Sequence, residues 1–77
     1  MILSELKPIF DRRKSFYGKA RLVIEYPFIK LYSYNTLVCI YDQDTKEVLD
    51  QDYYPHSYTT NRHVREFKRQ VQEGYIS

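Results

Sequence analysis

The stretch YPHSYTTNRHVREF, from Tyr54 to Phe67, decides the fold predicted for this chain. Pro55 fixes its own backbone φ and favours an extended conformation in the residue before it, so we expect a strand to end near Tyr54. After a short turn, the hydroxyl of Thr59 or Thr60 would cap a helix by accepting a hydrogen bond from a free backbone N–H group. The stretch therefore predicts the end of a sheet followed by the start of a helix.

The predicted helix has one apolar face. Val64, Phe67 and Val71 are spaced three and four residues apart, which places them on the same side of a helix. Gly74 follows at a place where a glycine commonly ends a helix in a left-handed backbone conformation. We therefore expect a C-terminal helix that packs against a sheet through these three apolar side chains.

The opposite face of the predicted helix is basic. It carries Arg62, Arg65 and Arg69, with Lys68 on the flank. Glu66 and Glu73 follow Arg62 and Arg69 by four residues, a spacing that favours ion pairs on a helix surface. Two interpretations stay open: an ordinary solvated helix face, or a surface that binds phosphate groups or an acidic partner.

The residues before this helix predict a second helix and a small sheet. Residues 2–13 have an apolar side of helical period and predict an N-terminal helix, which ends before Gly18. Strands are predicted at residues 19–25, 28–34, 36–41 and 46–49, with a possible extension of the last strand to Tyr54. Short turns between strands favour antiparallel pairing. The predicted fold is α+β: an N-terminal helix, a three- to four-stranded antiparallel sheet and a C-terminal helix packed on the sheet, in one domain of residues 1–77.

Charge is segregated along the chain, although the net charge is only +2. Residues 1–21 and 56–77 are rich in Lys and Arg, whereas residues 22–55 carry six acidic side chains against two basic ones. Either the basic ends complement the acidic middle within the fold, or the molecule has a dipolar binding surface. A chain of 77 residues buries a modest core, and a homodimer would be one way to stabilise it.

Cysteine content and hydropathy predict a cytoplasmic protein. Cys39 is the single cysteine, which excludes an internal disulfide bond and fits a reducing compartment. The sequence has no run of about 20 apolar residues, so we expect no membrane span and no membrane partner. Its first residues lack the basic and apolar pattern of a secretory signal peptide.

The sequence predicts neither catalysis nor metal binding. An acidic candidate patch comprises Asp42, Asp44, Glu47, Asp50 and Asp52. An EF-hand needs an oxygen donor where Lys46 stands and a Glu where Tyr53 stands, so a solvated hairpin turn is the better interpretation. Cys39 lies in an apolar strand, and a pair with His56 or His63 lacks a third, orienting group. We therefore predict a non-enzymatic protein without a metal or other cofactor.

The tyrosine content favours a binding surface, because tyrosine combines a flat apolar ring with a polar hydroxyl. The chain has nine tyrosines and no tryptophan. The predicted partner-binding residues are Arg62, Arg65, Lys68, Arg69, Tyr32, Tyr34 and Tyr54. Basic side chains interleaved with aromatic rings suit a single-stranded nucleic acid, so direct binding of DNA or RNA is one hypothesis. The blander interpretation is that tyrosine is simply a good strand former.

Three motifs span most of the chain: SFYGKA at residues 15–20, LYSYNTLV at residues 31–38 and SYTTNRHVREF at residues 57–67. They resemble a family of small uncharacterised proteins from phages, prophages and mobile elements of Gram-positive bacteria. That family carries no established activity, so the resemblance implies a mobile genetic element in a bacterial cell and no mechanism. Small phage proteins often bind host machinery, and anti-CRISPR proteins among them block a nuclease.

This context leads to two functional hypotheses. In the first, the chain is a phage-type binding protein that engages a host protein, as an anti-CRISPR-like inhibitor of a host defence nuclease. The acidic patch would then imitate phosphate groups toward that partner. In the alternative, the chain is a nucleic-acid-binding accessory protein that uses its basic C-terminal helix.

Overall fold

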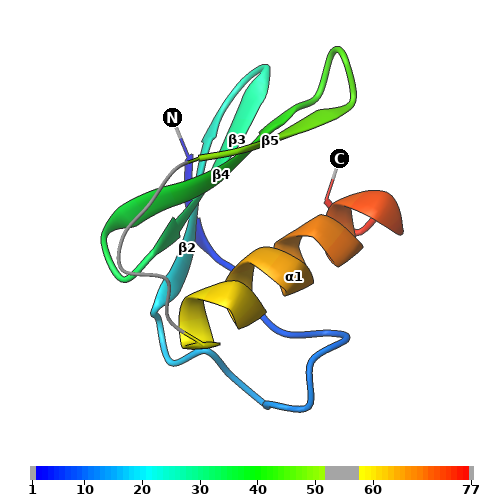
Figure 1. Cartoon of the computed structure of the whole chain (residues 1–77). Helices are drawn as coiled ribbons and strands as arrows, with labels where there is room; N and C mark the ends of the chain where they lie inside the picture. Colours follow the sequence, from blue (N-terminus) through cyan, green and yellow to red (C-terminus); the bar gives the residue numbers. More distant parts are fainter. Residues whose placement is uncertain (1, 52–57, 77) are drawn as a thin grey trace.

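Five antiparallel strands and one helix make up the computed structural model, which describes residues 2–51 and 58–76 (Figure 1). Along the chain these are β1 (Ile2–Glu5), β2 (Ala20–Glu25), β3 (Phe28–Ser33), β4 (Thr36–Asp42), β5 (Glu47–Asp50) and α1 (Tyr58–Gln72). Each strand pairs with the next, so the sheet has the order β1-β2-β3-β4-β5. Figure 1 shows α1 lying across one face of the sheet. The predicted α+β class and the four strands β2 to β5 are confirmed.

The core lies between α1 and the inner face of the sheet. Because side chains alternate along a strand, every second residue of the central strands points toward α1, and Leu22 and Leu31 are buried in this way. From the helix, Phe67 is 0% exposed, Val64 is buried and Val71 is partly buried beside them. The prediction that the apolar face of the helix packs against the sheet is confirmed.

The predicted N-terminal helix is wrong, and the sheet has five strands instead of three or four. The first residues form the edge strand β1, which pairs with β2 from Ile2 opposite Ile24 to Glu5 opposite Arg21. Further along, Pro8 has no N–H group and disfavours a helical conformation in the residue before it. The backbone N–H groups after Pro8 then donate to a carboxylate of α1, so they make no helical bonds of their own.

The start of α1 also differs from the prediction. The helix begins at Tyr58, so Thr59 and Thr60 lie inside its first turn and neither is the cap. Its end is as predicted: Gly74 has a φ of 83°, and the backbone N–H of the next residue donates to the Gln70 carbonyl oxygen over 2.8 Å. No helix in the described part of the chain is long and apolar enough to cross a membrane.

The sheet face that points away from α1 carries a row that is apolar except for Lys30, which we call the apolar row. Residues in register across all five strands are Leu3, Val23, Lys30, Ile40 and Leu49. Leu3 and Leu49 are 71% and 42% exposed. The neighbouring row on the same face is acidic and contains Glu25, Phe28, Asp42 and Glu47. We call the two rows together the outer face.

A buried polar cluster connects α1 to β3. Ser33 Oγ lies 3.0 Å from Thr60 Oγ1 and 2.7 Å from His63 Nδ1. The His63 ring is 0% exposed and packs edge-on against Phe16, with ring centroids 4.6 Å apart. Within the described residues its Nε2 has no hydrogen-bond partner. The imidazole therefore serves as a packing group with one polar contact, inside the helix–sheet interface.

We expect this imidazole to make stability depend on pH. Burial disfavours the imidazolium and lowers the pKa of His63 below its ordinary value of 6.5, while Asp11 opposes the shift and Arg13 adds to it. The unfolded chain then binds a proton more readily than the folded chain. The free energy of unfolding should therefore fall as the pH drops from about 7 to about 5.

Urea unfolding at a series of pH values measures this slope. The matched variant is His63→Gln, whose amide group keeps a polar contact available to Ser33. The variant should be less stable than the native chain, and its stability should depend less on pH because it lacks the His63 imidazole. His56 and all carboxylates remain in both proteins, so the difference between the two slopes reports on His63. Equal slopes for the two proteins would show that the His63 proton has no part in the effect.

Candidate functional site

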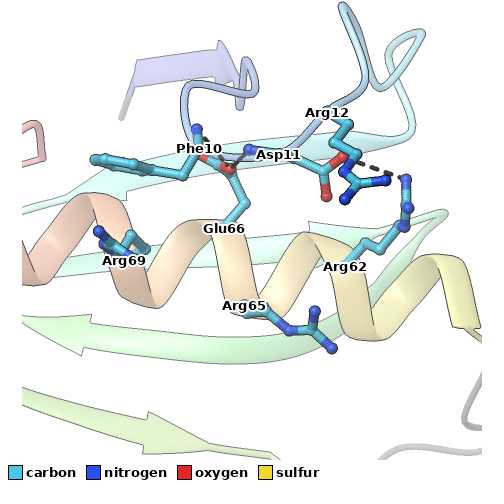
Figure 2. A pocket seen from close by; sticks show the side chains of 7 residues that line it. All are labelled: Phe10, Asp11, Arg12, Arg62, Arg65, Glu66 and Arg69. Atoms are coloured by element: carbon cyan, nitrogen blue, oxygen red, sulfur yellow. Dashed lines mark hydrogen bonds and ion pairs between the residues drawn. The ribbon is translucent and has the colours of Figure 1, made fainter.

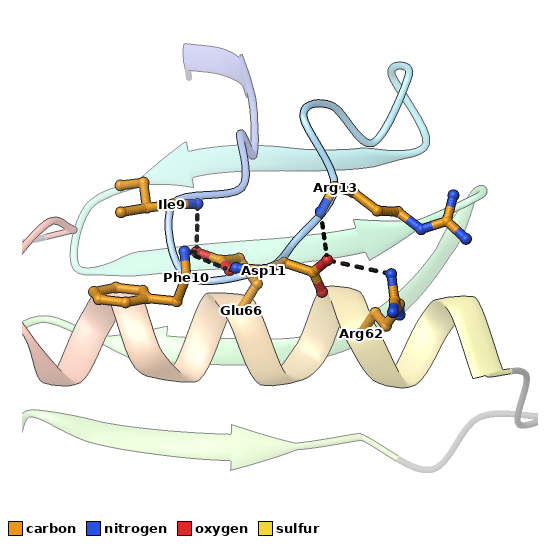
Figure 3. A network of polar contacts seen from close by, with 6 residues as sticks. All are labelled: Ile9, Phe10, Asp11, Arg13, Arg62 and Glu66. Carbon is orange, nitrogen blue, oxygen red and sulfur yellow. Dashed lines mark hydrogen bonds and ion pairs between the residues drawn. The ribbon is translucent and has the colours of Figure 1, made fainter.

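The carboxylate of Glu66 holds the segment of residues 6–19 against α1 (Figure 3). Its oxygens accept hydrogen bonds from three successive backbone N–H groups, those of Ile9, Phe10 and Asp11, over 2.9, 3.1 and 2.8 Å. Glu66 is only 3% exposed. Hydrogen bonds to an ionised carboxylate are stronger than bonds between neutral groups, and a buried carboxylate needs such donors. Glu66 is therefore the point at which the loop is fixed to the helix.

Gln70 completes this anchor from the next turn of α1. Its Nε2 donates to Glu66 Oε2 over 2.6 Å and to the Lys7 carbonyl oxygen over 2.7 Å. The anchor occupies Glu66, so the predicted pair between Arg62 and Glu66 is not formed. Arg62 instead contacts Asp11 of the loop, with Nη1 3.2 Å from Oδ1. The other predicted pair, Arg69 with Glu73, is present at 3.3 Å.

A hollow of about 270 Å³ opens between the anchored loop and α1 (Figure 2). We call it the arginine groove; it is lined by Phe10, Asp11, Arg12, Arg62, Arg65, Glu66 and Arg69. Four guanidinium groups thus face two carboxylates, which leaves the lining with an excess of two positive charges. Of the two carboxylates, Glu66 is saturated by backbone donors and lies beneath the surface.

Two of the four arginines have unused donors. Arg12 and Arg65 are both exposed, and within the described residues neither has a hydrogen-bond or ion-pair partner. Figure 2 shows Arg65 reaching out from α1, and Arg12 on the loop facing Arg62 of the helix. A guanidinium group carries five N–H donors in a fork that matches the oxygens of a phosphate or a carboxylate. The groove can therefore bind an anion without breaking an existing contact.

The structure brings together three of the predicted partner-binding residues. Arg62, Arg65 and Arg69 all line the arginine groove, as their spacing on the helix indicated. Lys68 points to the other flank, where its Nζ lies 2.9 Å from an Asp50 oxygen of β5. That contact belongs to a separate hollow of about 540 Å³ between β5 and the end of α1.

Two of the three predicted tyrosines, Tyr32 and Tyr34, do not line the groove. Tyr32 is in β3, in a row with Arg21 that points away from α1, and Tyr34 is in the turn after β3, with its ring centroid 5.9 Å from that of His63. Tyr54, together with Asp52 and His56, lies outside the described residues. The three helix arginines therefore share one hollow, whereas neither Tyr32 nor Tyr34 lines it.

Arg12 and Phe10 were missed as members of the site. Both were assigned to an N-terminal helix, whereas they belong to the loop that Glu66 holds. The local signal that could have found them is Pro8, which ends any helix start before these residues. A buried Glu on the apolar side of the C-terminal helix was the other signal, because it requires donors from elsewhere in the chain.

The acidic candidate patch divides between a turn and a strand. Asp42 ends β4 and Asp44 lies in the β4–β5 turn, where Asp42 Oδ1 accepts a hydrogen bond from the backbone N–H of Asp44 over 2.9 Å. Asp44 also accepts a hydrogen bond from the Tyr26 hydroxyl, and this contact raises the pKa of Tyr26. Glu47 and Asp50 belong to β5. Within the described residues, no three His, Cys, Asp or Glu side chains are grouped so that they could hold a metal ion.

Cys39 is a packing group of β4. It is 0% exposed, and burial together with the nearby Asp50 carboxylate raises the pKa of its thiol to about 11. A thiol with so high a pKa is almost entirely protonated near neutral pH and is a poor nucleophile. The geometry thus agrees with the expectation that Cys39 contributes to packing.

Removing the carboxylate of Glu66 should release the loop. Glu66→Ala leaves three backbone N–H groups and the Gln70 amide without their acceptor, so we expect the free energy of unfolding to fall by about 2–3 kcal/mol. Amide hydrogen exchange at Ile9, Phe10 and Asp11 should become faster than in the native chain.

The matched control is Glu73→Ala, which removes the same charge from an exposed pair with Arg69. It should change stability by no more than about 0.5 kcal/mol, because exposed ion pairs contribute little. If both variants lost the same stability, or if exchange at the loop stayed slow in Glu66→Ala, the anchoring role of Glu66 would be excluded.

One comparison with known proteins places the chain. Residues 4–76 match the model of a family of unknown function, DUF8033, and this range contains every residue that lines the arginine groove. No curated protein and no solved structure matches the chain. Because the family model covers nearly all of the 77 residues, the protein belongs to the family of unknown function DUF8033.

Proposed function

We propose that this chain is a non-enzymatic module that binds the phosphate backbone of a nucleic acid in the arginine groove. The observation that carries the proposal is a pair of guanidinium groups in one hollow, Arg12 and Arg65, that have no partner among the residues the structure describes. They come from segments far apart in the sequence and line the same hollow because the loop is anchored on α1. A phosphate placed between them would accept hydrogen bonds from both.

The fold does not need these two arginines, which supports a binding role. Arg62 ties the loop to the helix through Asp11, and Arg69 pairs with Glu73 and lies over the Phe10 ring. Arg12 and Arg65 have no such task within the described residues. Like charges held near each other raise the energy of the free protein, and an anion between them would relieve that repulsion. Released counterions would add to the affinity for a polyanion.

The binding of a labelled oligonucleotide at two salt concentrations tests the proposal. We expect Arg65→Ala, Arg12→Ala or both together to weaken binding at low salt by about tenfold per residue and to reduce the salt dependence. The control is Lys30→Ala on the outer face, which removes the same charge from a pair with Glu25 and should leave binding unchanged.

Two outcomes would reject the proposal. One is the absence of salt-sensitive binding by the native chain at low ionic strength. The other is an equal loss of affinity in Arg65→Ala and Lys30→Ala, because that would show a response to net charge alone and not to the groove.

The outer face supports a second candidate function, engagement of a host protein. Its apolar row runs next to a row that contains Glu25, Asp42 and Glu47. The partner that fits this face therefore has an apolar surface bordered by basic side chains. In a bacterial cytoplasm this partner would be a nucleic-acid-binding protein such as a defence nuclease, as in an anti-CRISPR-like inhibitor. This candidate extends the resemblance to phage proteins, which stays a prediction.

Affinity capture from a bacterial host lysate tests the second candidate with two matched baits. We expect Leu49→Arg to lose a stoichiometric protein partner, since it places a positive charge in the apolar row, while Arg65→Ala keeps that partner. Treatment of the lysate with nuclease separates protein contacts from contacts through nucleic acid. Capture that depends on Arg65, or that disappears after nuclease treatment, would favour the arginine groove and reject the second candidate.

A further inference from the structure

Exposed aromatic rings stand at both ends of the arginine groove. At one end the guanidinium carbon of Arg62 lies 5.4 Å from the centroid of the Tyr58 ring. At the other end that of Arg69 lies 4.6 Å from the centroid of the Phe10 ring, and Phe10 contacts Tyr75 edge-on at 5.6 Å. The rings of Tyr58, Phe10 and Tyr75 keep exposed fractions of 74%, 39% and 61%. Each end thus combines a cation with an open aromatic surface.

The helical period lines these groups up in one strip. Tyr58, Arg62, Arg65 and Arg69 follow each other at spacings of four, three and four residues, which keeps them on the same side of α1. From Tyr58 to Arg69 the strip is about 16 Å long at 1.5 Å per residue. A length of this order suits a short run of nucleotides, near the lower end of the site sizes of single-strand-binding domains.

We propose that the ligand of the arginine groove is an unpaired, single-stranded nucleic acid, whose phosphates lie on the arginines and whose bases stack on the rings at the two ends. This inference rests on the proposed function and narrows it to one class of ligand. Stacking on aromatic rings is open to any base because every base has a π face, and it requires bases that are not already stacked in a duplex. The ligand is therefore recognised by its lack of a partner strand more than by its sequence.

The position of the loop argues against a duplex. A helix that reads double-stranded DNA enters the major groove, whose width of about 12 Å just admits a helix with its side chains. Here the segment 6–19 lies along α1 on the side of Arg62 and Glu66 (Figure 3), so the helix does not protrude by itself. The groove that the loop forms is concave and admits a single flexible strand.

A purely structural role accounts for only part of this arrangement. The contact between Phe10 and Tyr75 packs the loop against the chain after α1, and this packing role is enough to explain the presence of both rings. Tyr58 is different, because it is 74% exposed at the first residue of the helix and packs only against the Arg62 guanidinium among the described contacts. The test therefore depends on Tyr58 as well as on Phe10.

The experiment measures fluorescence anisotropy of a labelled single-stranded oligothymidylate, a duplex of equal length and an inorganic polyphosphate competitor. We expect the single strand to bind at least tenfold more tightly than the duplex. Tyr58→Leu and Phe10→Leu should each weaken single-strand binding by about fivefold to tenfold and leave competition by polyphosphate unchanged, because they remove stacking but no charge. The matched control is Tyr26→Leu, equally exposed at 74% but in the β2–β3 turn, which should bind normally.

The outcomes separate this inference from the proposed function. Suppose that the native chain binds all three polyanions, that Arg65→Ala weakens this binding and that Tyr58→Leu has no effect. The single-strand inference would then be overturned, and the proposal of phosphate binding would stand. Absence of binding to every polyanion would overturn both. Thermal unfolding of Phe10→Leu shows whether the substitution releases the loop. If it does, the effect of Tyr58→Leu on single-strand binding alone tests the stacking inference.

Discussion

The hydrogen bonds between one buried carboxylate and three consecutive backbone amides are the constraint on which the rest of the molecule depends. Glu66 cannot be taken out of water without donors, and its own helix supplies only the Gln70 amide. The remaining donors come from Ile9, Phe10 and Asp11, so a long irregular loop is held in one place. That loop position sets Arg12 opposite Arg62 and puts the Phe10 ring under Arg69.

The sequence predicted those elements whose signals are local. Runs of strand-forming residues separated by short turns located the strands from β2 to β5. Spacings of three and four located α1, with Val64 and Phe67 on its buried side. The N-terminal prediction failed because the same residues carry a pattern compatible with a short helix. Pairing of β1 with β2 and the bonds to Glu66 decide between the two, and both partners are distant in sequence.

The candidate site follows the same division. Arg62, Arg65 and Arg69 belong to one helix, so their common face could be read from spacing alone. Lys68 belongs to the same helix but lies on its other flank, where it forms an ion pair with the Asp50 carboxylate of β5. Arg12 joins the groove because the backbone N–H of its neighbour Asp11 donates a hydrogen bond to the Glu66 carboxylate, 55 residues away in sequence. Pro8 argues against a helix in this segment, but no residue near Arg12 shows which part of α1 the loop contacts, so the place of Arg12 in the groove could not be predicted.

The anchor also makes the surface of α1 more basic than its side chains alone would. The helix carries four basic side chains and one acidic side chain, Glu66. In an isolated helix, Glu66 would be free to pair with Arg62 and so lower the potential of that face. Backbone amides occupy the carboxylate instead, and their dipoles offset its charge without using a guanidinium group. Asp11 takes one contact of Arg62 in return, but the donors of Arg65 have no acceptor in the described part of the chain. The same bonds that fix the loop therefore create the cationic groove.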